Sequence, residues 1–396
     1  MKTEILKGIR ILDFSRILAG PYATRILADF GAEVIKLQTK KTANGAESNT
    51  SGYFSAWNRN KKSITLDLSR PGAKELALRL AAICDVVVEN FSPRVMSNWG
   101  LTFDIIKKEK PDIIMLSMSG MGQTGPWKDF VAYGPTLQAL GGLTYLTGRK
   151  EGYPVGPGYA YADSVSGIYG AFLVLVALDY REQTGLGRYI DFSEYEAVCT
   201  LIGPALLDMA ADGAETFHLG SNFSGDDTAA PHGCYQCLGK DRWCVIDVFN
   251  EAEWQALMDV MGNPSWSKAE RFSTLSKRRE HAKELDERLG LWTSMQAVEE
   301  VVDLLQKAGV RAGIVQNAQD LANDPQLKKR GYFAHLKHPI LGDTISDRSP
   351  IRFSQGSSSN WKSSPLLGEN NRYVFMDLLG LTDQEFASYI ENGVIA

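Results

Sequence analysis

The first 193 residues alternate between short apolar runs and amphipathic stretches. The apolar runs are rich in Val, Ile and Leu, as buried strands are, and the stretches between them carry apolar residues at helical spacing. We expect strands at residues 8–14, 32–37, 63–68, 85–89, 112–117 and 189–192, and helices at residues 22–30, 71–83 and 103–108. Because crossovers of this length join parallel strands, the alternation predicts a doubly wound α/β sheet.

The pattern changes after residue 193. A long helix is expected at 194–211, and a Gly/Ser/Asp-rich stretch at 212–231 predicts a linker. A β-hairpin with the letters LGKD at its turn then opens a smaller α+β domain. The elements expected after the linker are the hairpin at 233–248, helices at 251–261, 277–293 and 297–308, a strand at 310–315, a loop at 338–364 and terminal helices at 371–379 and 382–392.

These elements divide the chain into parts. The large domain is expected at residues 1–211 and the linker at 212–231. The small domain is expected at 232–335, and residues 336–396 form a C-terminal segment. A length of 396 residues suffices for two hydrophobic cores.

One carboxylate, Asp163, directly follows a Pro/Gly-rich segment. The surrounding stretch, 153–178, reads YPVGPGYAYADSVSGIYGAFLVLVAL. Small residues follow Asp163, then an apolar helix at 171–178 that we expect in the core, and then a charged turn at 179–188. Two interpretations stay open here: an acidic residue that caps a helix N-terminus, or a catalytic carboxylate that a ligand reaches across the glycines.

Basic residues follow several of the expected strands. Arg16, Lys40, Lys41 and Arg94 all lie in segments that begin where a strand ends. Ligands of doubly wound sheets bind at these carboxyl ends, so the cations suit a phosphorylated or otherwise anionic ligand. The alternative is an ordinary solvated surface.

The letters GMGQTG at 120–125 match the dinucleotide-binding pattern G-x-G-x-x-G, but their surroundings do not fit that function. The match follows a late strand, no clear helix opens after it, and no acidic strand end lies about 20 residues on. The sequence has neither a P-loop nor a G-x-S-x-G elbow, and its five histidines, which begin at His218, show no metal-ligand spacing. A serine hydrolase and a metal hydrolase are therefore disfavoured.

The net charge, the cysteines and the N-terminus limit the possible partners and the compartment of the protein. A net charge of −5 argues against a nucleic-acid surface. The five cysteines are sparse and odd in number, which suits a reducing compartment, and Cys234 and Cys237 are interpreted as buried or strand-face thiols of the hairpin. The N-terminus lacks the apolar core of a signal peptide, and the run at 171–178 is too short to span a bilayer. We expect a cytoplasmic protein with no membrane partner.

An ordered set of motifs covers nearly the whole chain. It consists of GIRILDFSRILAGPYATRILADFGAEVIKL, NRNKKSITLDL, VVVENFSPRVMSNWGL, SMSGMGQTGP, AYGPTLQALGGLTYLTG, ADSVSGIYGA, TGLGRYIDFSEYEA, APHGCYQC, DLANDPQLKKRGYF and PLLGEN. This set resembles the class III CoA-transferases of the formyl-CoA, carnitine and benzylsuccinate type, a family that also includes α-methylacyl-CoA racemase. The resemblance implies a Rossmann-like large domain, a small domain, a C-terminal segment that returns to the large one, and two ring-shaped subunits interlocked in a dimer.

The resemblance also implies roles for individual residues. Asp163 falls where the family has its nucleophilic aspartate, which forms an aspartyl anhydride and then an aspartyl-CoA thioester. The scheme needs no metal and no tightly bound cofactor, since coenzyme A arrives as a thioester such as succinyl-CoA. The positions implied to contact coenzyme A are Arg16, Ile17, Leu18, Ala19, Lys40, Leu66, Asn90, Phe91 and Arg94.

The chain departs from the family at several positions. Thr39 and Asn98 stand where some relatives have Arg, so the phosphate contacts stay open. Racemases of this fold pair the aspartate with a histidine in the segment that here reads AYGPTLQA, and this chain has no histidine before His218. A transferase is therefore favoured over an acyl-CoA racemase or epimerase. A CoA-binding, non-catalytic subunit of a heteromer is the alternative to a homodimeric enzyme.

The small-domain side of the sequence bears on the acceptor acid. The stretch LGSNFSGDDTAAP at 219–231 is shorter than the glycine run of the formyl-CoA enzymes, which argues against oxalate or formate. APHGCYQC followed by DRWCVIDVF is closer to relatives that act on larger carboxylic acids, aromatic succinates among them. The sequence names neither the donor nor the acceptor.

Overall fold

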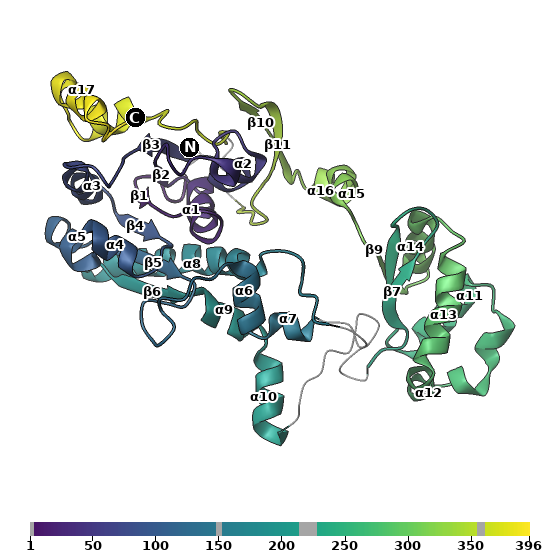
Figure 1. Ribbon diagram of the computed structural model, residues 1–396. Helices are drawn as coiled ribbons and strands as arrows, with labels where there is room; N and C mark the ends of the chain where they lie inside the picture. The colour runs from purple at the N-terminus through teal and green to yellow at the C-terminus, as the bar shows by residue number, and fades with distance from the viewer. Residues whose placement is uncertain (1–3, 148–152, 214–227, 355–360) are drawn as a thin grey trace. The chain divides into compact units, whose positions relative to one another are not determined.

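The computed structural model describes residues 4–147, 153–213, 228–354 and 361–396 (Figure 1). The chain forms two compact units. The larger comprises residues 1–143, 157–207 and 328–396, and the smaller comprises residues 144–156 and 208–327. Most of the expected linker, residues 214–227 with His218, lies outside the described residues.

A six-stranded parallel sheet organises the larger unit and confirms the predicted doubly wound α/β class. Its strands lie in the order β3-β2-β1-β4-β5-β6, and every neighbouring pair is parallel. The strands are β1 (Arg10–Asp13), β2 (Glu33–Gln38), β3 (Lys62–Thr65), β4 (Val86–Glu89), β5 (Ile114–Ser119) and β6 (Tyr189–Ser193). This is the order of dinucleotide-binding folds, in which the chain reverses direction across the sheet between β1 and β4.

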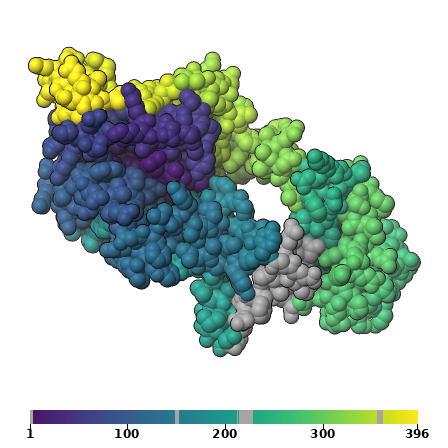
Figure 2. Space-filling model, in the orientation of Figure 1, coloured from purple at the N-terminus to yellow at the C-terminus, as the bar shows by residue number. Residues whose placement is uncertain are grey.

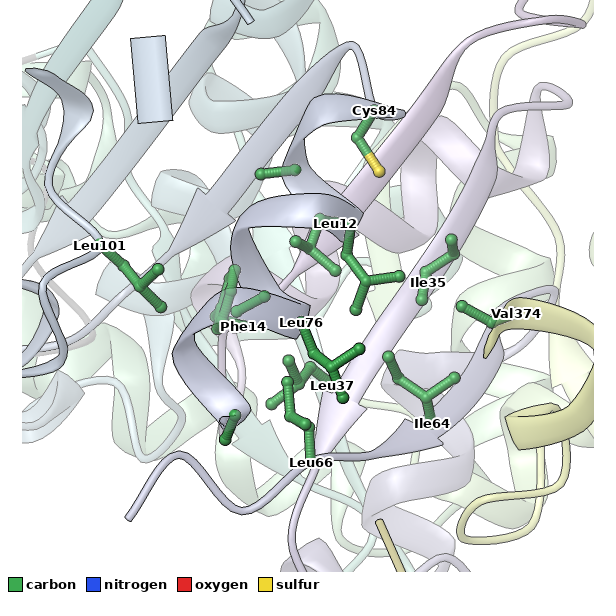
Figure 3. Close-up of a cluster of buried hydrophobic side chains, with 14 of the residues drawn as sticks. Leu12, Phe14, Ile35, Leu37, Ile64, Leu66, Leu76, Cys84, Leu101 and Val374 are labelled. Atoms are coloured by element: carbon green, nitrogen blue, oxygen red, sulfur yellow. The ribbon is translucent and has the colours of Figure 1, made fainter. Parts of the chain in front are cut away.

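Side chains alternate between the two faces of the sheet, so each face has its own core. On one face, Leu12 and Ile64 pack with Leu76 of α3 (Ala73–Ala82), and Figure 3 shows Val374 reaching the same cluster from the C-terminal segment. On the other face, Ile11 of β1 packs with residues of two further helices. These two are α1 (Ala19–Asp29) and α8 (Tyr161–Thr184), while α4 (Arg94–Trp99) and α5 (Phe103–Glu109) join strands on the first face.

Glycines let α8 lie close to its neighbours. A Cβ at Gly167 would stand 2.8 Å from the Tyr22 ring, and one at Gly170 would stand 2.8 Å from Met118 Sδ. The small residues after Asp163 therefore have a packing role, because they bring α8 against α1 and β5.

The α8 helix differs from the prediction in length and burial. It runs from Tyr161 to Thr184, so the expected charged turn at 179–188 is wrong for its first half. By length and composition alone α8 could cross a membrane, but 39% of its most apolar window is buried inside the protein. The expectation of a fully buried helix is also wrong, since one apolar face, which includes Phe172 at 58% exposed, lies at the surface.

Other elements complete the larger unit. The expected helix at 194–211 is broken at Ile202 into α9 (Glu194–Leu201) and α10 (Gly203–Asp212). The pattern did not predict α4, nor did it predict η1 (Gly45–Glu47), α2 (Gly52–Asn58), α6 (Gly134–Leu140) and α7 (Leu143–Leu146).

The C-terminal segment packs on the β3 edge of the sheet. It contains a π-helix at Tyr373–Leu378 and α17 (Asp383–Glu391), and Thr65 Oγ1 accepts from Ala396 N–H at 2.9 Å. In Figure 2 the yellow C-terminal residues cover the dark blue and purple N-terminal part. The expected loop at 338–364 is wrong in its first part, since β10 (Phe333–His338) and β11 (Gly342–Asp347) form an antiparallel hairpin.

The smaller unit contains a three-stranded antiparallel sheet, as the hairpin prediction required. Its strands are β7 (His232–Gln236), β8 (Trp243–Asp247) and β9 (Arg311–Ile314). The helices are α11 (Glu251–Val260), α12 (Leu275–Glu280), α13 (Ala282–Thr293), α14 (Val298–Lys307), α15 (Ala318–Asn323) and α16 (Pro325–Lys329), with short 3₁₀ turns η2 (Ser265–Lys268) and η3 (Glu270–Phe272). Cys234 is half-buried on β7 and Cys237 is buried directly after that strand, which confirms their interpretation as buried or strand-face thiols.

Candidate active site

The loops that follow β1 and β4 meet where the strand order reverses. Asn90 Oδ1 accepts from Arg16 N–H at 2.7 Å, and Asn90 Nδ2 donates to the Arg16 carbonyl oxygen at 2.8 Å. One side chain thus satisfies both backbone groups of Arg16. Two of the residues expected to contact coenzyme A are joined at the position where ligands of such sheets bind.

A buried ionic network supports the loop that follows β1, which is called the first loop and contains Arg16. Asp13 is fully buried and lies 3.0 Å from Lys61 Nζ and 3.7 Å from Lys36 Nζ. Burial alone would raise the pKa of Asp13, but the two lysine charges and hydrogen bonds from hydroxyl groups lower it to about 2. Lys61 also donates to the Pro21 carbonyl oxygen at 2.9 Å, and burial lowers its pKa to about 7. The buried ion pairs and the hydrogen bond from Lys61 therefore restrain the conformation of the first loop.

Backbone strain marks the same loop. Ile17 has φ +66°, a left-handed conformation that a β-branched residue rarely adopts and that costs about 1–3 kcal/mol. Glu47 Oε1 accepts from Ile17 N–H at 3.1 Å, and the Arg16 Nε atom lies 3.8 Å from Glu47 Oε2. Leu18 and Ala19, the next expected contacts, are buried at the start of α1. Glu47 therefore fixes a conformation that the loop would not adopt alone.

The remaining expected contacts divide into two groups. Lys40 is exposed and Leu66 is buried, and both line a cavity of about 350 Å³ at the carboxyl ends of β2 and β3. Phe91 packs edge-on against Trp99, with ring centroids 5.4 Å apart. Arg94 is exposed at the first position of α4 and makes no ion pair with any of the described residues.

Asp163 lies in the first turn of α8. Since α8 connects β5 to β6 and runs against the strands, its N-terminus stands at the same carboxyl edge as the loops above. The first N–H groups of α8 are capped by another residue: Gln138 Oε1 accepts from Tyr161 N–H at 2.6 Å and from Ala162 N–H at 3.3 Å. The N-cap position itself is Ala160, and Asp163 stands in the first turn, where its carboxylate accepts from its own backbone N–H. The helix-terminal role of Asp163 and its catalytic role therefore both remain open at this point.

Burial controls the charge of Asp163. Removal of the carboxylate from water raises its pKa to about 6, and its own backbone N–H partly opposes that rise. No Lys, Arg or His side chain of the described residues forms an ion pair with it. Tyr53 of α2 is close enough for the Asp163 charge to act on it: burial first, and then the charges of Asp163 and Glu47, raise the Tyr53 pKa to about 12. Asp163 is thus an ionised but poorly solvated carboxylate at neutral pH.

A buried carboxyl group lies near enough for the charge of Asp163 to act on it. Glu194 is the first residue of α9, directly after β6, and is 6% exposed. Burial and the charge of Asp163 raise its pKa well above the usual range. The sequence analysis missed Glu194, although its position four residues before the buried Val198 places it on the inward face of α9.

The chemistry available to this arrangement is that of a carboxylate. Asp163 can act as a nucleophile or as a base, and the loops beside it can bind an anionic ligand. Among the residues that the structure describes, no three His, Cys, Asp or Glu side chains form a group suited to a metal ion.

Comparison with known proteins agrees with this site. The family model described as CoA-transferase family III matches residues 6–371. The chain is 31% identical to the succinyl-CoA–D-citramalate CoA-transferase of Chloroflexus aurantiacus over 389 residues, which cover 96% of each chain. It is 32% identical to a formyl-CoA:oxalate CoA-transferase of Rhodopseudomonas palustris over 418 residues, which cover 100% of this chain and 98% of that one.

Solved structures show the same fold. A CAIB/BAIF family protein from Brucella suis superposes with a TM-score of 0.85 at 30% identity and covers 94% of this chain and 99% of its own. Rv3272 from Mycobacterium tuberculosis superposes with a TM-score of 0.79 at 27% identity, with the same coverage. The resemblance seen in the motifs is confirmed: the chain belongs to CoA-transferase family III, whose members act on coenzyme A thioesters.

Proposed function

We propose that this protein transfers coenzyme A from an acyl-CoA donor to a carboxylic acid acceptor, with Asp163 as the covalent nucleophile. The observation that carries the proposal is the position of Asp163. It is a half-buried carboxylate with no cationic partner among the described residues, at the sheet edge where Asn90 holds the Arg16 backbone. An unpaired carboxylate keeps its lone pairs available for attack, whereas a salt-bridged one would be stabilised in its ground state.

The reaction proceeds through two anhydrides and one thioester. An Asp163 carboxylate oxygen attacks the donor thioester carbonyl, the new C–O bond forms, and the C–S bond breaks as the electron pair leaves with the thiolate. The thiolate then attacks the aspartyl carbonyl, releases the donor acid as a carboxylate and leaves an aspartyl-CoA thioester. The acceptor carboxylate repeats both steps in reverse and regenerates Asp163. No proton is gained or lost, and no other reagent is consumed.

Coenzyme A is expected to lie along the carboxyl edge of the sheet. Arg16, Ile17, Leu18 and Ala19 form the first loop, and Lys40 and Leu66 line the cavity at the ends of β2 and β3. Asn90, Phe91 and Arg94 follow β4, which lies on the other side of β1 from that cavity. The cations of Arg16, Lys40 and Arg94 suit the phosphates of the nucleotide part.

We infer that the donor is a dicarboxylic acyl-CoA such as succinyl-CoA. One relative is named for succinyl-CoA and D-citramalate and another for formyl-CoA and oxalate. The short stretch at 219–231, which lies mostly outside the described residues, favours acceptors larger than oxalate.

The proposed assembly is a homodimer in the cytoplasm, with an interlocked arrangement expected from the family. Its support in this chain is the apolar face that α8 exposes. The side chains of that face are Ile168 (55% exposed), Phe172 (58%), Leu175 (42%) and Val176 (48%). A second subunit would remove such a patch from water.

A racemase is the second candidate function. The observation in its favour is Glu194, a second carboxyl group beside Asp163, which could act as the other base of an α-proton exchange. Incorporation of deuterium at the α-carbon of an acyl-CoA in D₂O, without an acceptor acid, would support it.

A donor-by-acceptor screen tests the transferase. Purified protein is mixed with succinyl-CoA or acetyl-CoA and a panel of carboxylic acids, and mass spectrometry follows acyl-CoA products. Hydroxylamine added during turnover should convert the Asp163 thioester to a hydroxamate that peptide mapping locates. Asp163→Ala should abolish both signals, and full activity of that variant would overturn the assignment. Activity of the purified single chain would also exclude a role as a non-catalytic subunit.

A further inference from the structure

The steps proposed above leave one buried group of the site without a role. Glu194 is 6% exposed, and no ion pair or hydrogen bond of its side chain occurs among the described residues. A buried carboxyl group that has no cation nearby resists ionisation, since its charge would find neither water nor a counter-ion.

The packing of three helices explains why Glu194 reaches Asp163. Leu137 of α6, Ala162 of α8 and Val198 of α9 form one small apolar cluster. Ala162 precedes Asp163 in the chain, and Glu194 lies one helical turn before Val198 on the same face of α9. The cluster therefore brings the first turns of α8 and α9 together, and the charge of Asp163 acts on Glu194.

The neighbouring elements offer few other charges. α6 carries no titratable side chain in its sequence GPTLQAL. Tyr53 of α2 is a phenol whose pKa is raised to about 12, chiefly by burial. Tyr159 precedes α8, and its hydroxyl lies 3.3 Å from Ser164 Oγ. Glu47 is engaged with the first loop through Ile17 N–H. The charge state of the pair is therefore decided chiefly by Asp163 and Glu194 themselves.

We propose that Glu194 is a positioning residue that keeps its proton beside Asp163 and so leaves Asp163 as the single ionised carboxylate of the pair. This rests on the proposed function, in which Asp163 is the nucleophile. Every species in the proposed reaction other than the covalent adducts is an anion: the Asp163 carboxylate, the thiolate, and the donor and acceptor acids. A neutral Glu194 adds no further negative charge to that site, so it does not repel the incoming anions. The proton stays on Glu194 in every step.

The first test needs no substrate. Carboxyl carbons of Glu are labelled with ¹³C in the full chain, and the NMR signals are followed from pH 5 to pH 9. One Glu signal should remain at its protonated position at pH 7 and disappear in Glu194→Gln. Glu89 is also buried, with its pKa raised to about 7 by burial, so Glu89→Gln identifies its separate signal. The absence of a protonated signal that depends on Glu194 would overturn the proposal.

The second test is a pH profile with succinyl-CoA as the probe. The rate of Asp163 acylation should rise near pH 6 as Asp163 ionises, and then fall about tenfold per pH unit once Glu194 loses its proton. Glu194→Gln should keep the rise and lack the fall, whereas Glu194→Asp should keep both, with KM for succinyl-CoA changed less than kcat. Glu196→Gln, an exposed neighbour on the same helix, should leave the profile unchanged.

The outcomes separate the two proposals. A lower rate at every pH with an unchanged profile would mean that Glu194 only supports the fold, and a rise displaced to lower pH in Glu194→Gln would mean that Glu194 ionises before Asp163. Either result overturns the role of Glu194 while the transferase stands. A protonated Glu194 signal together with full activity of Asp163→Ala would instead overturn the nucleophile, and with it the role given to Glu194. Thermal unfolding of each variant checks that it is folded.

Discussion

The backbone of Gly134 lies so close to Asp163 that a Cβ at Gly134 would stand 2.1 Å from Asp163 Oδ2. The same Cβ would meet Ala160 Cβ at 3.2 Å, so the space has no free side. Gly134 belongs to the segment AYGPTLQA, in which racemases of this fold carry their histidine. At position 134 itself, only hydrogen fits beside the carboxylate in its present position.

Gly134→Ala should therefore reduce acyl transfer sharply while the protein stays folded. The added methyl group has to move the Asp163 carboxylate, and a displacement of about 1 Å costs a reaction about 100-fold in rate. Steady-state kinetics with succinyl-CoA and circular dichroism measure the two effects. Gly203→Ala is the matched control, because a Cβ at Gly203 meets nothing within 4 Å. Activity of Gly134→Ala within twofold of the wild type would contradict the expectation.

Asn90→Ala should weaken binding of the acyl-CoA more than it slows the chemistry. The change removes both hydrogen bonds to the Arg16 backbone. Loss of about 1.4 kcal/mol corresponds to a tenfold increase in KM, with kcat changed less. The control is Gln183→Ala, which removes an exposed amide near the C-terminal end of α8, away from the coenzyme A positions. A fall in kcat with KM unchanged would place Asn90 in the reaction rather than in coenzyme A binding.

Lys61→Met should destabilise the protein by an amount that grows with pH. Lys61 has a pKa of about 7 when folded, below its value of 10.5 in the unfolded chain. Between these values the unfolded state binds more protons, so the stability of the wild type rises with pH by up to about 1.4 kcal/mol per unit, and below pH 7 the slope disappears. Lys61→Met also removes a buried partner of Asp13, which costs about 3 kcal/mol.

Urea unfolding at pH 7, 8 and 9 measures this difference. Lys62→Met is the control, since Lys62 is partly exposed and its Nζ lies 3.7 Å from Glu33 rather than from Asp13. A difference between the wild type and Lys61→Met that does not change over this range would show that Lys61 holds its proton throughout.

The sequence predicted the parts of the fold that depend on local pattern. All six parallel strands are apolar runs, and helices connect each strand to the next, so apolar runs and helical spacing were enough to identify the strands. The hairpin of β10 and β11 was missed because β11, GDTISD, is polar and mostly exposed, and its pairing with β10 supplies what its composition does not indicate. Likewise α8 was expected inside the core, because its sequence cannot show which neighbours cover each face.

The sequence predicted those residues of the candidate site that belong to the family motifs. Asp163, Arg16 and Asn90 carry the family resemblance, and the structure joins Arg16 and Asn90 directly. Glu194 carried no such signal: an acidic residue after a Ser N-cap is ordinary at a helix start, and only the packing of α9 against α6 and α8 shows that it is buried. Long-range burial is the information that the local pattern lacks.

The exposed face of α8 gives the last prediction. Phe172→Glu should convert a dimer into a monomer, because a charge cannot be buried in an apolar interface without a partner and the lost Phe side chain alone contributes about 2 kcal/mol. Sedimentation equilibrium should give twice the 43.6 kDa chain mass for the wild type and a single chain mass for the variant. Gln183→Glu, which adds the same charge at an exposed polar position near the end of α8, should remain a dimer. A wild-type chain that sediments as a monomer, or a dimeric Phe172→Glu, would mean that this face is covered by something other than a second copy.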